Sequence, residues 1–103
     1  MDNMNRAKKI KLLTNTYTVD SIGQRIPTVT EKPVFALIWS ASQSEFFNAG
    51  EHGLKPDKVF DVLITEYEGQ TEISYAGNTY TVYRTYERDD GRVELHTEKR
   101  VGD

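Results

Sequence analysis

The stretch ISYAGNTYTVYRTYERDDGRVELHTEKRV, residues 73–101, contains runs of alternating side chains that are separated by tight turns. Ala76-Gly77-Asn78 joins a run over Thr71–Tyr75 to a run over Thr79–Glu87, and short turns rich in Gly and Asn are typical of β-hairpins. We therefore predict consecutive antiparallel strands here, and this prediction decides the fold class.

The last run of this stretch alternates cleanly between apolar and polar positions. It follows the turn Arg88-Asp89-Asp90-Gly91 and covers Arg92–Val101. Because successive side chains of a strand point to opposite faces, we expect one face to be buried, with Val93, Leu95 and Thr97. The other face is predicted to be exposed, and it carries Arg92, Glu94, His96, Glu98 and Arg100.

Two runs before this stretch also read as strands. Lys58–Tyr67 alternates, with Phe60, Val62 and Ile64 on one face. Val34–Ala41 is apolar on both faces, which is typical of a central strand that is covered on both sides.

The beginning of the chain reads as a hairpin that ends before this central strand. Lys8–Asp20 is a predicted strand, Asp20–Gly23 a turn, and Gln24 to about Thr30 a returning strand. Pro27 lacks a backbone N–H and favours an edge position or a bulge, and Pro33 is expected to interrupt the chain.

A helix is predicted in the long connection at about 42–57. Ser42 or Ser44 can cap its start, and Glu45 is favourable near the positive end of the helix dipole. Gly53 and Pro56 end it, so we expect a helix over Gln43–His52. The full prediction is all-β: about seven antiparallel strands in a small barrel or sandwich, one short helix, and one domain over residues 1–103.

Composition limits the chemistry. The 103 residues carry a net charge of -3 and no cysteine, so disulfides, thiolate zinc sites and a cysteine nucleophile are excluded. Two distant histidines offer little for metal binding, and no catalytic motif is present, so we expect no enzyme, no metal and no cofactor. No run is long enough to cross a membrane and no signal peptide is expected, which favours a reducing cytoplasm.

Two features leave alternatives open. The tyrosines late in the chain suit either a base-stacking platform or cross-strand core packing, and the mild acidity favours core packing. The connection Ser42–Asp57 is long and contains apolar residues, so its helix either plugs one end of the barrel or contacts another chain.

The ordered set of segments resembles a known family. A hairpin start, the strand end Trp39-Ser40-Ala41-Ser42, the segment SEFFNAGEHGLKPDKVFDVLI (44–64) and the segment ISYAGNTYTVYRTYERDDGRVELHTEKRVG (73–102) together resemble the head–tail joining, or head-closure (stopper), proteins of long-tailed bacteriophages. The resemblance covers nearly the whole chain.

The resemblance implies a structural virion protein of the head–tail connector, assembled in the bacterial cytoplasm. Its partners would be further copies in a ring, dodecameric by resemblance, portal and adaptor proteins above, a tail or tail-completion protein below, and packaged DNA that passes without sequence-specific binding. No membrane is involved. A tail-completion or adaptor protein, and a nucleic-acid-binding barrel, are the alternatives.

The resemblance also assigns roles to two groups of residues. In relatives the long loop plugs the channel, and the corresponding residues here are Ser44, Glu45, Phe46, Phe47, Asn48, Glu51, His52, Leu54 and Lys55. The acidic side chains of this loop are expected to repel DNA phosphates. The basic start is expected to contact an acidic neighbouring subunit through Arg6, Lys8, Lys9 and Lys11.

Overall fold

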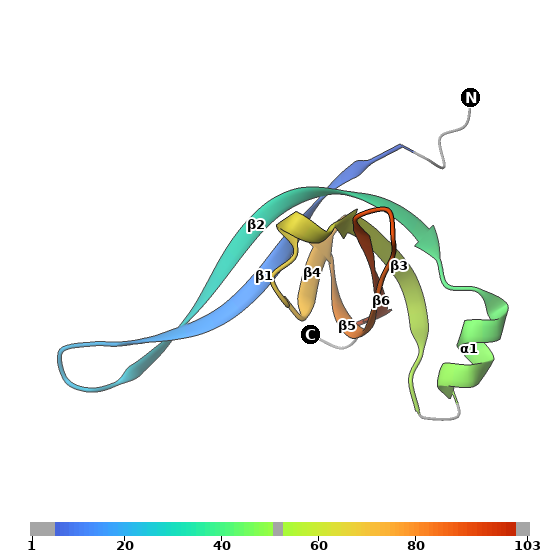
Figure 1. Ribbon diagram of the computed structural model, residues 1–103. Coiled ribbons are helices and arrows are strands. Elements are labelled where there is room, and N and C mark those ends of the chain that lie inside the picture. The colour runs from blue at the N-terminus through green and yellow to red at the C-terminus, as the bar shows by residue number, and fades with distance from the viewer. Residues whose placement is uncertain (1–5, 51–52, 101–103) are drawn as a thin grey trace.

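The computed structural model describes residues 6–50 and 53–100, and it has six strands that close into one antiparallel barrel in the order β1-β2-β3-β6-β5-β4 (Figure 1). The strands are β1 (Lys8–Val19), β2 (Arg25–Ser40), β3 (Pro56–Leu63), β4 (Glu72–Tyr75), β5 (Asn78–Glu87) and β6 (Arg92–Lys99), with the helix α1 over Gln43–Gly50 and a 3-10 turn, η2, over Ile64–Glu66. The predicted small all-β barrel with one short helix is confirmed. The predicted ends at His52 and Val101 lie outside the described residues.

The prediction of a break at Pro33 is wrong, and this reduces the count from about seven strands to six. β2 continues through Pro27 and Pro33, which lie opposite Tyr17 and Lys11 of β1. β3 pairs with β2 only from Leu37 onward, so one edge of the earlier part of β2 has no partner strand in the described residues. A proline on such an edge removes no ladder hydrogen bond.

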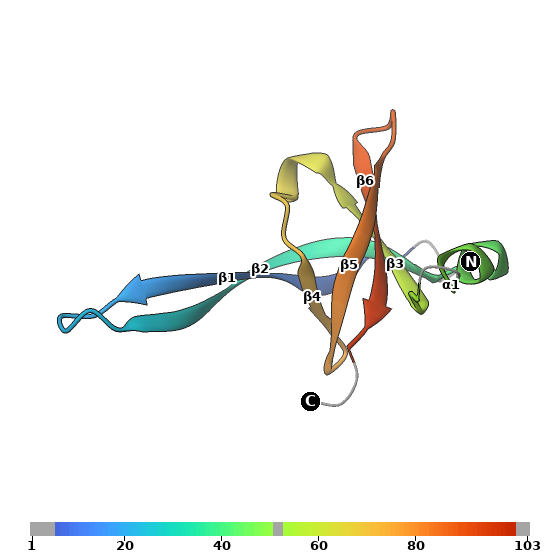
Figure 2. The ribbon, with the colours of Figure 1, turned by 90° about the horizontal axis from the view of Figure 1, so that it is seen from below.

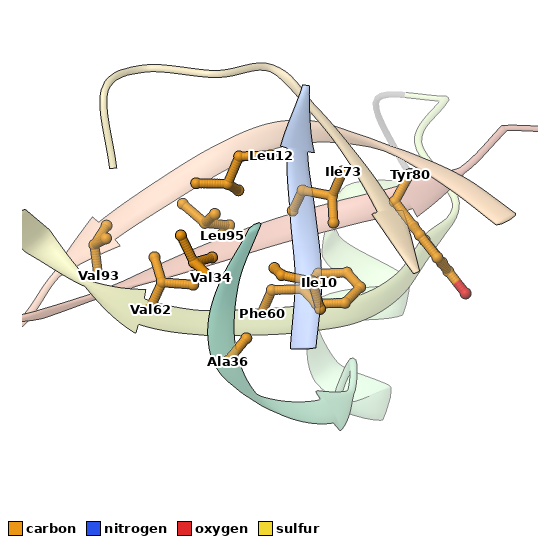
Figure 3. Packing of buried hydrophobic residues seen from close by; sticks show 10 residues of the cluster. All are labelled: Ile10, Leu12, Val34, Ala36, Phe60, Val62, Ile73, Tyr80, Val93 and Leu95. Carbon is orange, nitrogen blue, oxygen red and sulfur yellow. The ribbon is translucent and has the colours of Figure 1, made fainter. Parts of the chain in front are cut away.

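The core lies inside the barrel and receives side chains from all six strands (Figure 3). Phe60 of β3 is fully buried, and its ring meets those of Tyr75 and Tyr80 edge-on at centroid distances of 5.9 and 5.2 Å. Such edge-on pairs add to the stabilisation from burial alone. The predicted inward residues Val93, Leu95 and Thr97 are buried, and so are Phe60 and Val62, which were predicted to share a face.

A β-hairpin arm extends away from the barrel (Figures 1 and 2). β1 contacts β4 only through Lys11–Leu13, so residues 14–30, which we call the arm, pair only with one another. Asp20 closes the tip as predicted, because its Oδ1 accepts hydrogen bonds from the N–H groups of Ile22 and Gln24 at 3.0 and 2.8 Å. The arm makes the molecule long, with extents of 54 × 31 × 26 Å.

A bulge in β5 changes which tyrosines face the core. The register with β6 shifts between Val82 and Arg84, and the extra residue is Tyr83. Because the bulge reverses the alternation beyond it, Tyr80 is 2% exposed whereas Tyr86 is 55% exposed. Uninterrupted alternation would place Tyr80 and Tyr86 on one face of the strand, and the bulge separates them.

We expect the substitution Phe60→Ala to lower the free energy of unfolding by about 3–5 kcal/mol, because it opens a cavity in the closed barrel and removes both ring contacts. Urea denaturation of the purified protein measures this. Phe35→Ala is the matched control, since Phe35 is 60% exposed on β2, and its effect should stay within about 1 kcal/mol. Equal losses from both substitutions would contradict the described core.

Candidate interaction surfaces

The outer face of β2, β3, β6 and β5 carries most of the polar contacts, and we call it the outer wall. Two rows of paired residues define it: Leu37, Asp61, Glu94 and Tyr86, and then Trp39, Val59, His96 and Arg84. α1 packs against β3 on the outside of the barrel (Figure 1). The outer wall is thus partly covered by the helix and otherwise open.

Glu45 attaches the first turn of α1 to the outer wall. Ser42 caps the helix as predicted, with the Glu45 N–H donating to Ser42 Oγ at 3.1 Å. The Glu45 carboxylate lies 2.8 Å from His96 Nδ1 and 3.5 Å from Arg84 Nη2, and it accepts a hydrogen bond from the Tyr83 hydroxyl. The β5 bulge makes this possible, because it places Tyr83 and Arg84 on the same side of the strand.

His96 is buried, not exposed as its position in the alternating run predicted. It is 6% exposed and lies between two carboxylates, with Glu45 at Nδ1 and Glu94 at Nε2, the latter at 3.0 Å. The run predicted exposure because alternation identifies the outer face but does not show that α1 covers part of it. The two carboxylates meet opposite sides of the ring, and no cluster suited to a metal ion occurs within residues 6–50 and 53–100.

A chain of alternating charges continues from Glu94 along the outer wall. Arg88 Nη1 lies 2.9 Å from Glu94 and 2.7 Å from Oδ2 of Asp61, and Arg92 Nη2 donates to the Asp61 carbonyl at 2.9 Å. Asp61 is only 1% exposed, and its Oδ2 makes the ion pair with Arg88 without hydrogen-bond geometry. A buried carboxylate is tolerated when cations compensate its charge, and here two arginines do so.

The same contacts shift two pKa values. Burial raises the pKa of Glu45, but the hydrogen bonds from Tyr83 and His96 and the charges nearby outweigh it, so the pKa lies below its ordinary value of 4.5. Burial, followed by the hydrogen bond to Glu45, raises the pKa of Tyr83. Both pKa shifts mean that the surroundings favour an ionised Glu45 beside a neutral Tyr83.

The structure places some of the predicted plug residues. The Glu45 carboxylate contacts His96 and Arg84, so the first turn of α1 lies against the outer wall of the barrel. Ser44 and Lys55 are exposed, Leu54 is half-buried, and the Lys55 N–H donates to Glu98 at 3.2 Å. Glu51 and His52 lie outside the described residues, as do the side chains of Phe46, Phe47 and Asn48. That this loop enters a channel stays a prediction.

The predicted basic contact residues are accessible. Arg6, Lys8, Lys9 and Lys11 are all exposed, and Lys11 pairs with Glu31 of β2 at 3.3 Å. Lys9 lies opposite Phe35 on the outer face. Their role in subunit contact is not tested by a single chain and stays a prediction.

Large apolar side chains are exposed on the outer wall around its charged centre. They are Phe35, Trp39, Leu63 and Tyr86, each at least 39% exposed. The expectation that β2 is covered on both sides is therefore wrong for the described residues: Val34 and Ala36 face the core, while Phe35 and Trp39 face outward. Trp, Tyr and Arg are enriched at the energetic centres of protein interfaces.

The two faces of the arm differ. One face consists of the pairs Thr14–Thr30, Thr16–Thr28 and Thr18–Ile26, and the other of Asn15–Val29, Tyr17–Pro27 and Val19–Arg25. On the second face, which we call the outer face of the arm, Tyr17, Val19 and Val29 are each more than half exposed. The guanidinium of Arg25 lies 4.5 Å from the centre of the Tyr17 ring. This surface was not predicted from the sequence, although the alternation of Thr with apolar residues was its signal.

Comparison with models of known protein families gives no match, and comparison with curated proteins gives none either. The resemblance to head-closure proteins therefore rests on the sequence segments quoted above. Within the part of the chain that the structure describes, no helix has the length and apolar character needed to span a membrane.

We expect Glu45→Gln to lower the free energy of unfolding at pH 7 by about 1–2 kcal/mol, because charge-assisted contacts to His96, Tyr83 and Arg84 are weakened. The folded-state pKa of Glu45 lies below the unfolded one, so the stabilisation is present above the ordinary value of 4.5 and is lost as the pH falls through the folded value. The difference between variant and wild type should therefore shrink in acid. Urea denaturation at several pH values measures it.

The control is Glu68→Gln. Glu68 is largely exposed and lies 3.8 Å from Lys32, so its contribution should be close to zero at every pH. A Glu45 variant that matches this control at pH 7 would contradict the attachment of α1 through Glu45.

Proposed function

We propose that this protein is a structural subunit of the head–tail connector of a long-tailed bacteriophage. In this proposal it forms a ring below the portal and adaptor, closes the DNA channel after packaging and provides the surface on which the tail docks. Within the virion its partners are further copies of itself, the portal–adaptor proteins, the tail or tail-completion protein and the packaged DNA. The proposal assigns it no catalytic activity, metal or cofactor.

The observation that carries the proposal is the apolar arm. A two-stranded hairpin is only marginally stable by itself in water, and this one exposes Tyr17, Val19 and Val29 beyond the reach of its own barrel. Exposed apolar surface of this kind is typical of an assembly contact. The sequence segments quoted above connect such an assembly protein with phage head closure.

The position of Tyr80 and the charge of the chain support passage of DNA without binding. Tyr80 belongs to the core, so its ring is not available for base stacking, and the Tyr83 hydroxyl is bound to Glu45. Residues 41–100 contain seven Lys or Arg against twelve Asp or Glu. An acidic body gains little from contact with phosphates.

Interruption of this gene in the phage or prophage that carries it tests the proposal. We expect lysates with separate tails and with heads that have lost their DNA, because neither channel closure nor tail docking takes place, and negative-stain electron microscopy detects both. Complementation with the intact gene is the control. Normal infectious particles would overturn the connector function, and full heads with incomplete tails would favour the tail-completion alternative.

A shortened loop tests the plug. The Ala41 N–H donates to the Asp57 carbonyl at 2.9 Å and Ser40 pairs with Lys58, so a short glycine turn can replace residues 44–55 without opening the barrel. We expect this variant to fold, assemble and dock tails, but to lose packaged DNA. Glu45→Gln in the full-length loop is the control, because it removes the anchor charge and keeps the loop. Stable, full particles from the shortened chain would contradict the plug.

A further inference from the structure

The arm and the part of the outer wall that α1 leaves open are exposed, and both carry large apolar side chains. We propose that the outer face of the arm of one copy docks on the outer wall of a second copy of this chain. This inference deepens the proposed function, and it rests on that function for the ring in which the contact would occur.

The first support is apolar area on both sides of the contact. The arm offers Tyr17, Val19 and Val29, and the outer wall offers Phe35, Leu63 and Tyr86. Leu37 pairs with Asp61, so Phe35 and Leu63, each two residues further along, lie at neighbouring positions on the wall. Tyr86 lies on β5, two strands away from β3, in the same row as Asp61 and Glu94. Burial of such side chains is the main driving force of association.

The second support is charge. Residues 8–40, which form β1, the arm and β2, contain five Lys or Arg against two Asp or Glu, whereas residues 41–100 are acidic. Arg25 lies on the outer face of the arm, and the exposed acids Glu87, Asp89 and Asp90 follow Tyr86 at the end of β5. The arm itself, residues 14–30, carries one cation, Arg25, and one carboxylate, Asp20, which accepts hydrogen bonds from the backbone of the tip. Arg25 is thus the exposed charge on the outer face of the arm, and the acids that follow Tyr86 are complementary to it.

Charge also disfavours contact between the outer faces of two arms, because each of these faces carries Arg25. Pairing along the free edge of β2 is also hindered by Pro27 and Pro33, which cannot donate to a neighbouring strand. The arm extends away from its own wall, so an intramolecular contact is not available (Figure 2). An arm-to-wall contact uses a different surface on each copy, and such a contact generates a ring when the rotation closes.

Three variants test the contact in solution. The arm variant is Tyr17→Thr with Val29→Thr, and the wall variant is Leu63→Thr with Tyr86→Thr. The matched control is Ile26→Thr, which makes the same chemical change at an exposed position on the threonine face of the arm. All residues concerned are exposed, and circular dichroism and urea denaturation verify that each variant keeps the fold.

Analytical ultracentrifugation measures association up to roughly 1 mM subunit, so that a dissociation constant near this value is still detected. We expect the wild type and the control to associate. For the arm variant alone and for the wall variant alone, we expect an association constant that is at least tenfold lower. A mixture of the arm variant and the wall variant should form a dimer and nothing larger, because one intact arm meets one intact wall. This recovery in the mixture distinguishes an arm-to-wall contact from an arm-to-arm contact.

Each other outcome overturns the inference. A wild type that stays monomeric at the highest concentration, an arm variant that associates normally, or a wall variant that associates normally excludes the arm-to-wall contact. An equal loss of association in the Ile26→Thr control excludes the outer face of the arm as the contact surface. These results leave the gene-interruption experiment unaffected, so failure of the contact is distinguishable from failure of the connector function.

Discussion

The pairing of β1 with β4 closes the barrel, and the rest of the structure depends on it. Only three residues of β1, Lys11–Leu13, make this pairing, and they suffice to enclose Leu12 and Ile73 in the core. Closure removes the sheet edges that β1 and β4 would otherwise expose at this point. Residues 14–19 of β1 are not needed for closure, and they extend outward with β2 as the arm.

Closure also explains why the inner and outer faces of these strands differ in polarity. The inner face is apolar and packed around Phe60. The outer face cannot contribute to that core, so its polar residues form a chain from Glu45 through His96, Glu94 and Arg88 to Asp61. This chain fixes α1 at one end and leaves apolar side chains around it exposed. The arrangement suits a protein whose outer face meets another chain.

The two proposals differ in what they require. The connector function depends on the resemblance of the sequence segments, on the exposed arm and on a loop whose middle lies outside the described residues. The arm-to-wall contact depends on exposed residues, on their register and on the charge of Arg25 on the outer face of the arm. A barrel that recruits its neighbour through an arm needs no large flat interface, because the arm extends the contact surface of an 11.8 kDa chain.

The sequence by itself determined the fold class, the hairpin turns and most of the inward-facing residues. Local rules suffice for these: alternation identifies the two faces of β6, Asp20 forms its own turn, and Ser42 caps the helix. For the candidate surfaces, the sequence located the basic start and the apolar excess of Val34–Ala41, but not the arm or the contacts of Glu45.

Tertiary structure decided the rest, because it depends on which residues far apart in the chain meet. Pro33 stays within a strand since β3 begins to pair only at Leu37, and Tyr86 turns outward because Tyr83 bulges opposite β6. His96 is buried although its run is alternating, since Glu45, 51 residues earlier, is placed over it. Register, bulges and coverage by distant elements leave no periodic signal in the sequence, whereas the faces of a strand and the residues of a turn do.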